Sequence, residues 1–144
     1  EKPQEVDLRA YLEEIVGRID DAARVRWHGS GPALRSVAIG SLRRVMQNLL
    51  ANARQHGAGV PEVVVESQRN VTIHVQDRGP GIPKESRDAV FQPFFRLDRS
   101  RSLATGGSGL GLAIVQQLCQ AHGWTIEIRE RDGGGTDAVL TICR

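Results

Sequence analysis

Apolar residues recur at helical spacing in three stretches of the chain. The first stretch predicts a helix over Leu8–Ile19, with Asp7 before it as a capping residue. The second predicts a helix over Ala38–His56, which Gly57 ends. The third predicts a helix over Gly109–Gly123. Each of these segments is long enough to cover part of a sheet with one apolar face.

Short runs rich in β-branched residues lie between and after these helices and predict strands. The runs are Arg24–Trp27, Ala33–Val37, Glu62–Gln68, Val71–Asp77, Trp124–Glu130 and Ala138–Cys143, with a short helix expected over Lys84–Val90. Strands that follow one another in sequence favour pairing between neighbours. We therefore predict an α+β fold with one mixed, mostly antiparallel sheet covered on one face by three helices. No repeat or linker divides the chain, which predicts one domain over residues 1–144.

The composition limits the classes of function. The chain has 144 residues, of which 40% are hydrophobic and 25% charged, as in soluble globular domains. A net charge of +2 and an aromatic content of 4% give no support for a nucleic-acid partner. The longest apolar run, about seven residues, is too short to cross a membrane. Residue 1 is Glu and no leader follows it, so we expect a piece of a longer protein.

Two asparagines share one face of the second predicted helix. Asn48 and Asn52 are four residues apart, and Gln55 and His56 extend the same polar row. Such a row can be a solvated helix face. Asparagine is nevertheless a poor helix former, and an amide oxygen is a neutral ligand suited to Mg²⁺. A magnesium ion held this way keeps its charge available for phosphate oxygens.

Asp77 ends a predicted strand and begins the turn Asp77-Arg78-Gly79-Pro80-Gly81. It has the same parity as the apolar residues of that strand, so its carboxylate projects toward the apolar side. A carboxylate there needs a donor, and an adenine amino group is one candidate. Glycines just beyond the strand let the backbone approach a flat ring. The alternative is an Asx turn that only ends the strand.

Glycine is the one residue type in clear excess, with 16 in 144 residues, or about 11%, against an average near 7%. A cluster of them, Gly106-Gly107-Ser108-Gly109-Leu110-Gly111-Leu112, leads directly into the third predicted helix. Backbone N–H groups at a helix N-terminus bind phosphate, and small residues let them converge. The segment matches neither a Walker loop nor a dinucleotide fingerprint. A flexible loop with tight helix packing is the alternative.

Together, these segments resemble the conserved boxes of sensor histidine kinases. Asn48–Asn52 resembles the N box, Asp77–Gly81 the G1 box, Val90–Arg96 the F box and Gly107–Leu112 the G2 box, and Gly134-Gly135-Thr136 resembles a last glycine box. The resemblance covers nearly the whole chain. It implies the Bergerat-type α/β sandwich of the superfamily that also holds gyrase, heat-shock chaperones and MutL. Within that family, Phe91–Arg96 and the residues after it look most like the osmosensor-type subgroup.

The resemblance implies a site for ATP and Mg²⁺. Asn52 would be the Mg²⁺ ligand, and Asn48, Asn52 and Arg96 would act in catalysis. Residues 91–107 would form the lid over ATP, with its hinge at Gly106 and Gly107. The residues implied in nucleotide binding are Asn48, Asn52, Gln55, His56, Asp77, Gly79, Gly81, Ile82, Gly107, Ser108, Gly109, Leu110, Gly111, Leu112 and Thr136. Among them, Asp77 would read adenine with help from the Thr136 hydroxyl.

The sequence departs from the family pattern after the metal-binding asparagine. Many members carry Lys or Arg three residues later and Tyr one residue after that, where this chain has Gln55 and His56. Arg54 lies about 100° away around the helix and cannot simply replace the missing charge. Either the lid arginines compensate, or the affinity for nucleotide is modest.

The phosphoacceptor of the family is a histidine followed by Glu on a separate dimerisation domain, and none of the four histidines here is followed by Glu or Asp. The resemblance therefore implies that this chain binds ATP or ADP and donates the γ-phosphate to a histidine elsewhere, with a response regulator downstream. Phosphoryl transfer relies mainly on positioning and charge neutralisation. The resemblance also implies a cytoplasmic, monomeric piece of an inner-membrane homodimer, and two cysteines fit a reducing compartment.

Three alternatives remain open. The chain could be another ATPase of the superfamily or a protein serine kinase. It could be a nucleotide-binding module that has lost kinase activity, which the Gln55 departure leaves open although the intact Asn52 argues against it. It could also be an interaction domain that binds no nucleotide.

Overall fold

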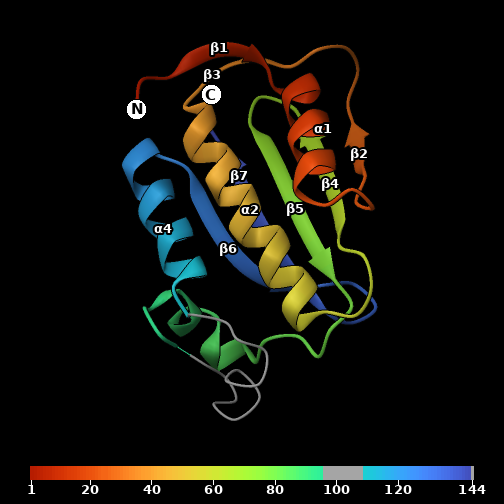
Figure 1. Cartoon of the computed structure of the whole chain (residues 1–144), viewed down its shortest axis with the longest axis vertical. Coiled ribbons are helices and arrows are strands. Elements are labelled where there is room, and N and C mark those ends of the chain that lie inside the picture. The colour runs from red at the N-terminus through yellow and green to blue at the C-terminus, as the bar shows by residue number, and fades with distance from the viewer. Residues whose placement is uncertain (96–108, 144) are drawn as a thin grey trace.

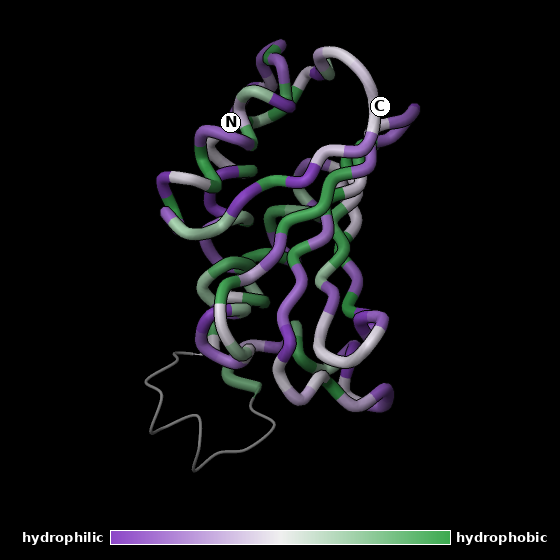
Figure 2. The backbone as a smooth tube through the Cα atoms, turned by 90° about the vertical axis from the view of Figure 1, so that its right-hand side faces the viewer, coloured by the Kyte–Doolittle hydropathy of each residue, from purple (hydrophilic) through white to green (hydrophobic). Residues whose placement is uncertain are grey.

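Five strands form one mixed sheet, and three helices pack against one face of it (Figure 1). The structure is a computed structural model that describes residues 1–95 and 109–143. The sheet consists of β2 (Val25–His28), β4 (Glu62–Ser67), β5 (Val71–Asp77), β6 (Thr125–Glu130) and β7 (Thr136–Ile142). The helices are α1 (Leu8–Ile19), α2 (Ile39–His56) and α4 (Gly111–His122). Figure 2, turned by 90°, shows the helices to one side of the sheet.

The strand order is β2-β4-β5-β7-β6, and only the β2–β4 pair is parallel. The predicted fold class, α+β with a mostly antiparallel sheet under three helices, is therefore confirmed. A second, two-stranded sheet pairs β1 (Gln4–Asp7) with β3 (Leu34–Val37). The sequence pattern did not predict β1, because this strand has only four residues and its first two are exposed.

The core lies between the helices and the inner face of the sheet. In β5, residues 71, 73, 75 and 77 are buried and those between them are half-buried, which is the alternation of a strand with one covered face. The apolar stripe of α2 is buried, and Leu42, Val45 and Met46 are completely inaccessible to solvent. Leu8, Leu12 and Val16 of α1 are buried to the same extent. Within the described ranges, no helix combines the length and apolar character needed to cross a membrane.

The helix starts differ in how they are capped. Asp7 caps α1 as predicted, because its Oδ1 accepts hydrogen bonds from the backbone N–H groups of Arg9 (3.2 Å) and Ala33 (3.0 Å). Helix α2 has no side-chain cap of its own. The carboxylate of Glu1 takes that role, since it accepts from the backbone N–H groups of Gly40 and Ser41, both at 2.8 Å. A hydrogen bond from the Ser41 hydroxyl (2.8 Å), together with these backbone contacts, holds the pKa of Glu1 below its ordinary value.

Three predicted elements differ from the structure by more than one residue. The segment expected as one short helix, Lys84–Val90, forms two separate 3₁₀ turns, η1 (Lys84–Ser86) and η2 (Ala89–Phe91). Helix α4 begins at Gly111 rather than Gly109, because Gly109 has a left-handed backbone with φ of 77°. Strand β7 begins two residues earlier than predicted, since Thr136 already pairs with Asp77.

Candidate functional site

Four segments that are far apart in sequence meet at one end of the molecule. The C-terminal ends of α2 and β5, the loop between β6 and β7, and the start of α4 all lie toward the lower end in Figure 1. These segments carry the predicted asparagine row, the turn at Asp77, the last glycine run and the end of the G2 box. The fold therefore brings together pieces that the sequence analysis had assigned to one site.

Asp77 occupies the buried end of β5. Its side chain lies on the inner face of the sheet, as its parity predicts, and the residue is only 9% exposed. The Oδ1 atom accepts hydrogen bonds from the backbone N–H of Gly79 (2.8 Å) and that of Thr136 (3.3 Å). The bond from Gly79 is the Asx turn that the sequence analysis considered. This turn fixes the orientation of the carboxylate, so it is compatible with a ligand at the same carboxylate.

Glycines allow three backbone segments to approach Asp77. A Cβ on Gly57, just after α2, would lie 2.5 Å from the Cβ of Asp77. A Cβ on Gly79 would lie 2.4 Å from the carbonyl oxygen of His56, and one on Gly135 would lie 2.0 Å from that of Asp77. No real Cβ contact is that short, so these positions require glycine. Gly57 and Gly135 were missing from the predicted site, although Gly135 stands directly before Thr136 in the last glycine box.

Gly81 connects this turn to the loop between β6 and β7. Its φ of 80° is left-handed, and a Cβ there would lie 3.3 Å from the carbonyl oxygen of Gly135. The next residue, Ile82, is partly buried and packs against the core. Gly81, the first of the two predicted ring-lining residues, therefore approaches Gly135, whose backbone lies against that of Asp77.

The two asparagines of α2 lie along the side of the helix that faces α4. Asn48 donates from Nδ2 to the carbonyl oxygen of Arg44 (3.0 Å), and its Oδ1 lies 3.2 Å from the position a Cβ on Gly111 would take. Asn52, one turn further along, is half-buried. Gly111 is the first residue of α4, so the N box and the end of the G2 box are in contact.

The F and G2 boxes also meet. The backbone N–H of Phe94 donates to the carbonyl oxygen of Gly109 (2.8 Å), and a Cβ on Gly109 would lie 2.8 Å from the Cα of Phe94. Phe94 has a φ of 64°, which is uncommon outside glycine, and its side chain is 68% exposed. Backbone strain of this kind gathers at functional sites, and no sequence signal marked this residue for it.

The remaining predicted residues divide into three groups. Gln55 and Leu110 are half-buried, and Leu112 is partly buried against the core. His56 is exposed, and its carbonyl oxygen is the atom that Gly79 approaches. The predicted Arg96, Gly107, Ser108 and lid hinge lie outside the described residues.

Arg54 is held by another contact. Its guanidinium forms two hydrogen bonds with Asp20, at 2.7 and 2.9 Å, where α1 ends. This pair holds the pKa of the Asp20 carboxyl below its ordinary value. The prediction that Arg54 cannot supply the charge missing at Gln55 agrees with this geometry.

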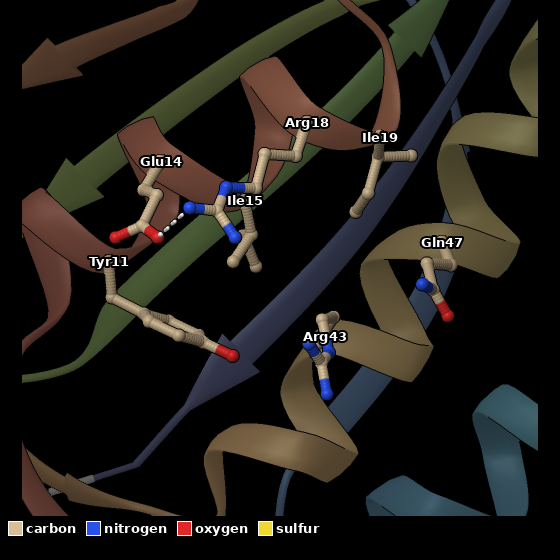
Figure 3. Close-up of a pocket in the computed structure, with 7 residues that line it drawn as sticks. All are labelled: Tyr11, Glu14, Ile15, Arg18, Ile19, Arg43 and Gln47. Carbon is tan, nitrogen blue, oxygen red and sulfur yellow. Dashed lines mark ion pairs between the residues drawn. The ribbon is translucent and has the colours of Figure 1, made fainter.

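A pocket of about 350 Å³ lies elsewhere, between α1 and α2 (Figure 3). Its lining residues are Tyr11, Glu14, Ile15, Arg18, Ile19, Arg43 and Gln47. None of them was predicted as a site residue. The carboxylate of Glu14 is paired with Arg18 (3.1 Å), and the lining residues include no glycine, unlike the surroundings of Asp77.

Comparison with known families identifies the domain. Residues 38–144 match the family described as histidine kinase-, DNA gyrase B- and HSP90-like ATPase. The chain belongs to this family. The matched residues include both asparagines, Asp77 and Thr136. The family assignment agrees with the resemblance carried by those boxes.

Individual relatives agree with this assignment. The chain is 39% identical over 106 residues to the sensor-like histidine kinase SenX3 of Mycolicibacterium smegmatis, covering 72% of this chain and 28% of that protein. It is 30% identical over 146 residues to the sensor protein kinase WalK of Staphylococcus haemolyticus, covering 95% of this chain and 24% of that protein. The solved ATP-binding domain of PrrB from Mycobacterium tuberculosis is 28% identical with a TM-score of 0.74, and the match covers 99% of this chain and 98% of that one.

This protein is therefore an ATP-binding catalytic domain of the kind found in two-component sensor histidine kinases. The chain spans about a quarter of the length of the two curated relatives. Predictions about the osmosensor-type subgroup and about the residues that bind nucleotide remain predictions.

Proposed function

We propose that this domain binds Mg·ATP at the end where α2, β5, β7 and α4 meet, and presents the γ-phosphate to a histidine outside the chain. The observation that carries the proposal is the buried carboxylate of Asp77, fixed by two backbone N–H groups and surrounded by glycines. A carboxylate held this way is a rigid acceptor on an otherwise apolar face. Such an acceptor suits the exocyclic amino group of adenine and disfavours the carbonyl that guanine has at that position.

The glycines fit a flat base. Gly81 and Gly135 approach each other so closely that a Cβ on Gly81 would touch the backbone of Gly135. Without side chains at these positions, a ring can lie against the backbone beside Asp77. In this proposal Ile82 supplies an apolar side to the ring, and Gly79 keeps the carboxylate oriented.

The asparagine row fits the metal and phosphate end. Because Nδ2 of Asn48 donates to its own helix, Oδ1 faces the first turn of α4. We assign the Mg²⁺ ligand to Asn52 and a phosphate-side role to Asn48. Backbone N–H groups at the start of α4 would bind phosphate oxygens there, as helix N-termini do.

When bound, Mg·ATP supplies the phosphoryl group and the positive charge that screens its oxygens. The residues of this chain bind, orient and shield it, which is most of what phosphoryl transfer requires. The acceptor histidine and its general base would come from a dimerisation domain of the same protein, and a response regulator would receive the phosphoryl group next. In this proposal residues 1–144 are one domain on the cytoplasmic side of an inner-membrane homodimer, and the isolated piece is a monomer.

Calorimetric titration with ATP and GTP, with and without Mg²⁺, tests the binding step. We expect ATP to bind more tightly than GTP, and Mg²⁺ to strengthen the binding of ATP. If no purine nucleotide binds, the proposal is wrong. If ATP affinity is independent of Mg²⁺, the result favours a nucleotide-binding module without kinase activity.

Transfer needs a second assay. With labelled ATP and a purified histidine-containing dimerisation domain of a relative, we expect acid-labile phosphate on that domain. Acid-stable phosphate would indicate serine kinase activity instead.

A further inference from the structure

Arg131 is a buried cation on the opposite face of the sheet from Asp77. It follows β6 directly and is only 7% exposed. An arginine this buried requires a partner for its charge. Its Nη2 lies 2.7 Å from Oε2 of Glu62, the first residue of β4. The contact holds the pKa of the Glu62 carboxyl below its ordinary value, and Arg78 and Arg26 lower it further.

This ion pair joins strands that are not neighbours. In the order β2-β4-β5-β7-β6, two strands separate β4 from β6. Glu62 is in register with Gln76, the residue before Asp77, and Glu130 is in register with Thr136, which itself pairs with Asp77. The Arg131–Glu62 pair therefore extends across the outer face of the sheet at the level where Asp77 lies on the inner face.

The loop that Arg131 begins joins β6 to β7 and consists largely of glycine. Gly133, Gly134 and Gly135 all have left-handed φ values, between 87° and 107°. Two backbone hydrogen bonds close the loop: Arg131 N–H donates to the Gly135 carbonyl (3.1 Å), and Gly134 N–H donates to the Arg131 carbonyl (2.9 Å). Three consecutive glycines leave the backbone many alternatives. Gly135 nevertheless has to stay in contact with Asp77.

We propose that Arg131 is a positioning residue for the nucleotide base, and that its ion pair with Glu62 holds the loop at Gly133–Gly135 against the turn at Asp77. The position of Gly135 decides both the gap beside Gly81 and the hydrogen bond from Thr136 N–H to Asp77. A loop released from Glu62 would widen that gap and loosen the acceptor that distinguishes adenine from guanine. This inference rests on the proposed function, because it assigns the base to this site.

The test compares Arg131→Met with Arg129→Met in the full 144-residue chain. Methionine keeps an unbranched apolar side chain and removes the charge. Arg129, in β6 two residues before Arg131, is the matched control, since it pairs with Glu127 (2.9 Å) and both side chains are exposed. We expect Arg131→Met to weaken ATP binding about tenfold, the lower end of what loss of a supporting partner costs at metal sites, and to bring ATP and GTP affinities closer together. Arg129→Met should leave both affinities at the wild-type values.

Amide hydrogen exchange gives a readout that does not depend on nucleotide. In Arg131→Met, and to a smaller degree in Glu62→Gln, we expect faster exchange at the Thr136 amide while amides in the middle of β5 keep their wild-type rates. The charge-reversed pair Glu62→Arg with Arg131→Glu should restore part of the ATP affinity. This double variant tests the ion pair itself rather than the bulk of either side chain.

The outcomes separate this inference from the proposed function. If the wild-type chain binds no purine nucleotide, both fail. If the wild type binds ATP and Arg131→Met binds it equally well, with the same preference over GTP, only this inference is overturned. It is also overturned if Arg131→Met loses affinity only in proportion to its unfolded fraction, with the ATP-to-GTP ratio unchanged.

Discussion

Asp20 and Asp77 are buried to the same extent and are held in different ways. Each is 9% exposed, and each lies at the end of a regular element, Asp20 after α1 and Asp77 at the end of β5. The guanidinium of Arg54 neutralises Asp20 with two hydrogen bonds. Asp20 also accepts from the backbone N–H of Ala22 (3.2 Å), whereas the donors to Asp77 are the backbone N–H groups of Gly79 and Thr136.

The difference separates a structural carboxylate from a candidate ligand. A guanidinium fills both oxygens of Asp20 and ties α1 to α2, so little acceptor capacity remains. Backbone N–H groups fix Asp77 through one oxygen, Oδ1, and the glycines around it keep side chains away. Burial alone would not have distinguished the two residues, whereas the identity of their donors does.

The largest expected effect concerns the glycine that contacts the backbone of Asp77. Gly135→Ala combines a left-handed φ of 107° with a Cβ 2.0 Å from the Asp77 carbonyl oxygen. We expect it to lower the free energy of unfolding by at least about 3 kcal/mol. Gly134→Ala is the control, because its φ is 105° and nothing lies within 4 Å of its Cβ. Gly134→Ala should lose only the unfolding free energy that backbone strain costs. If urea unfolding gives equal losses of unfolding free energy for the two variants, the contact between Gly135 and Asp77 is not close.

The next effect is on binding. Asp77→Asn keeps an oxygen that can accept from Gly79 and Thr136, so the fold should remain. We expect ATP affinity to fall by about 1–3 kcal/mol, roughly 5- to 150-fold, because an amide offers one acceptor oxygen instead of two. Calorimetry with ATP and GTP measures it. An unchanged ATP affinity would place the base elsewhere.

Asp20→Asn is the matched substitution at the other carboxylate. Removal of its charge leaves Arg54 without its partner, and we expect a loss of about 1–2 kcal/mol in unfolding free energy, since the half-exposed guanidinium can be solvated again. ATP affinity should match that of the wild type. If instead the nucleotide affinity changes and the stability does not, the assignment of roles to the two residues is reversed.

The smallest effect is on pH dependence. Contacts with Arg54 and with Arg131 lower the pKa values of Asp20 and Glu62 from their ordinary 3.8 and 4.5. A carboxyl with a lowered pKa stabilises the fold above its unfolded pKa, and this contribution disappears as pH falls through the folded value. We expect unfolding free energy to be flat between about pH 7 and 5 and to decline below about pH 4. The decline should be shallower in Asp20→Asn, and an identical slope would contradict the pairing.

Most of the fold could be predicted because periodicity reports burial directly. The buried alternation of β5 and the apolar stripe of α2 both follow from packing against one core. Strand β1 was not predicted, because its pairing with β3 leaves no apolar alternation in so short a segment. The short helix at Lys84–Val90 was wrong because the hydrogen bonds of η1 and η2 span three residues rather than four, a difference that local propensity does not show.

The site was predictable in its polar residues and less so in its glycines. Asp77 and the two asparagines carry a chemical signal in a linear sequence, namely a carboxylate at the end of a strand and amides four residues apart. The need for glycine at positions 57 and 135 comes from contacts with Asp77, through its side chain at Gly57 and through its backbone at Gly135, which no local pattern records. The Arg131–Glu62 pair has a separation of 69 positions, and only the strand order places its two ends together.

The packing of α1 also bears on how far the chain can be shortened from its N-terminal side without exposing the core. The match to the family begins at residue 38, yet Leu8, Leu12 and Val16 have no solvent exposure at all. A chain shortened to the matched residues would lose α1 and the edge strand β2, and water would reach the apolar side chains those elements cover. The stretch that the family description matches is thus shorter than the stretch whose side chains build the core.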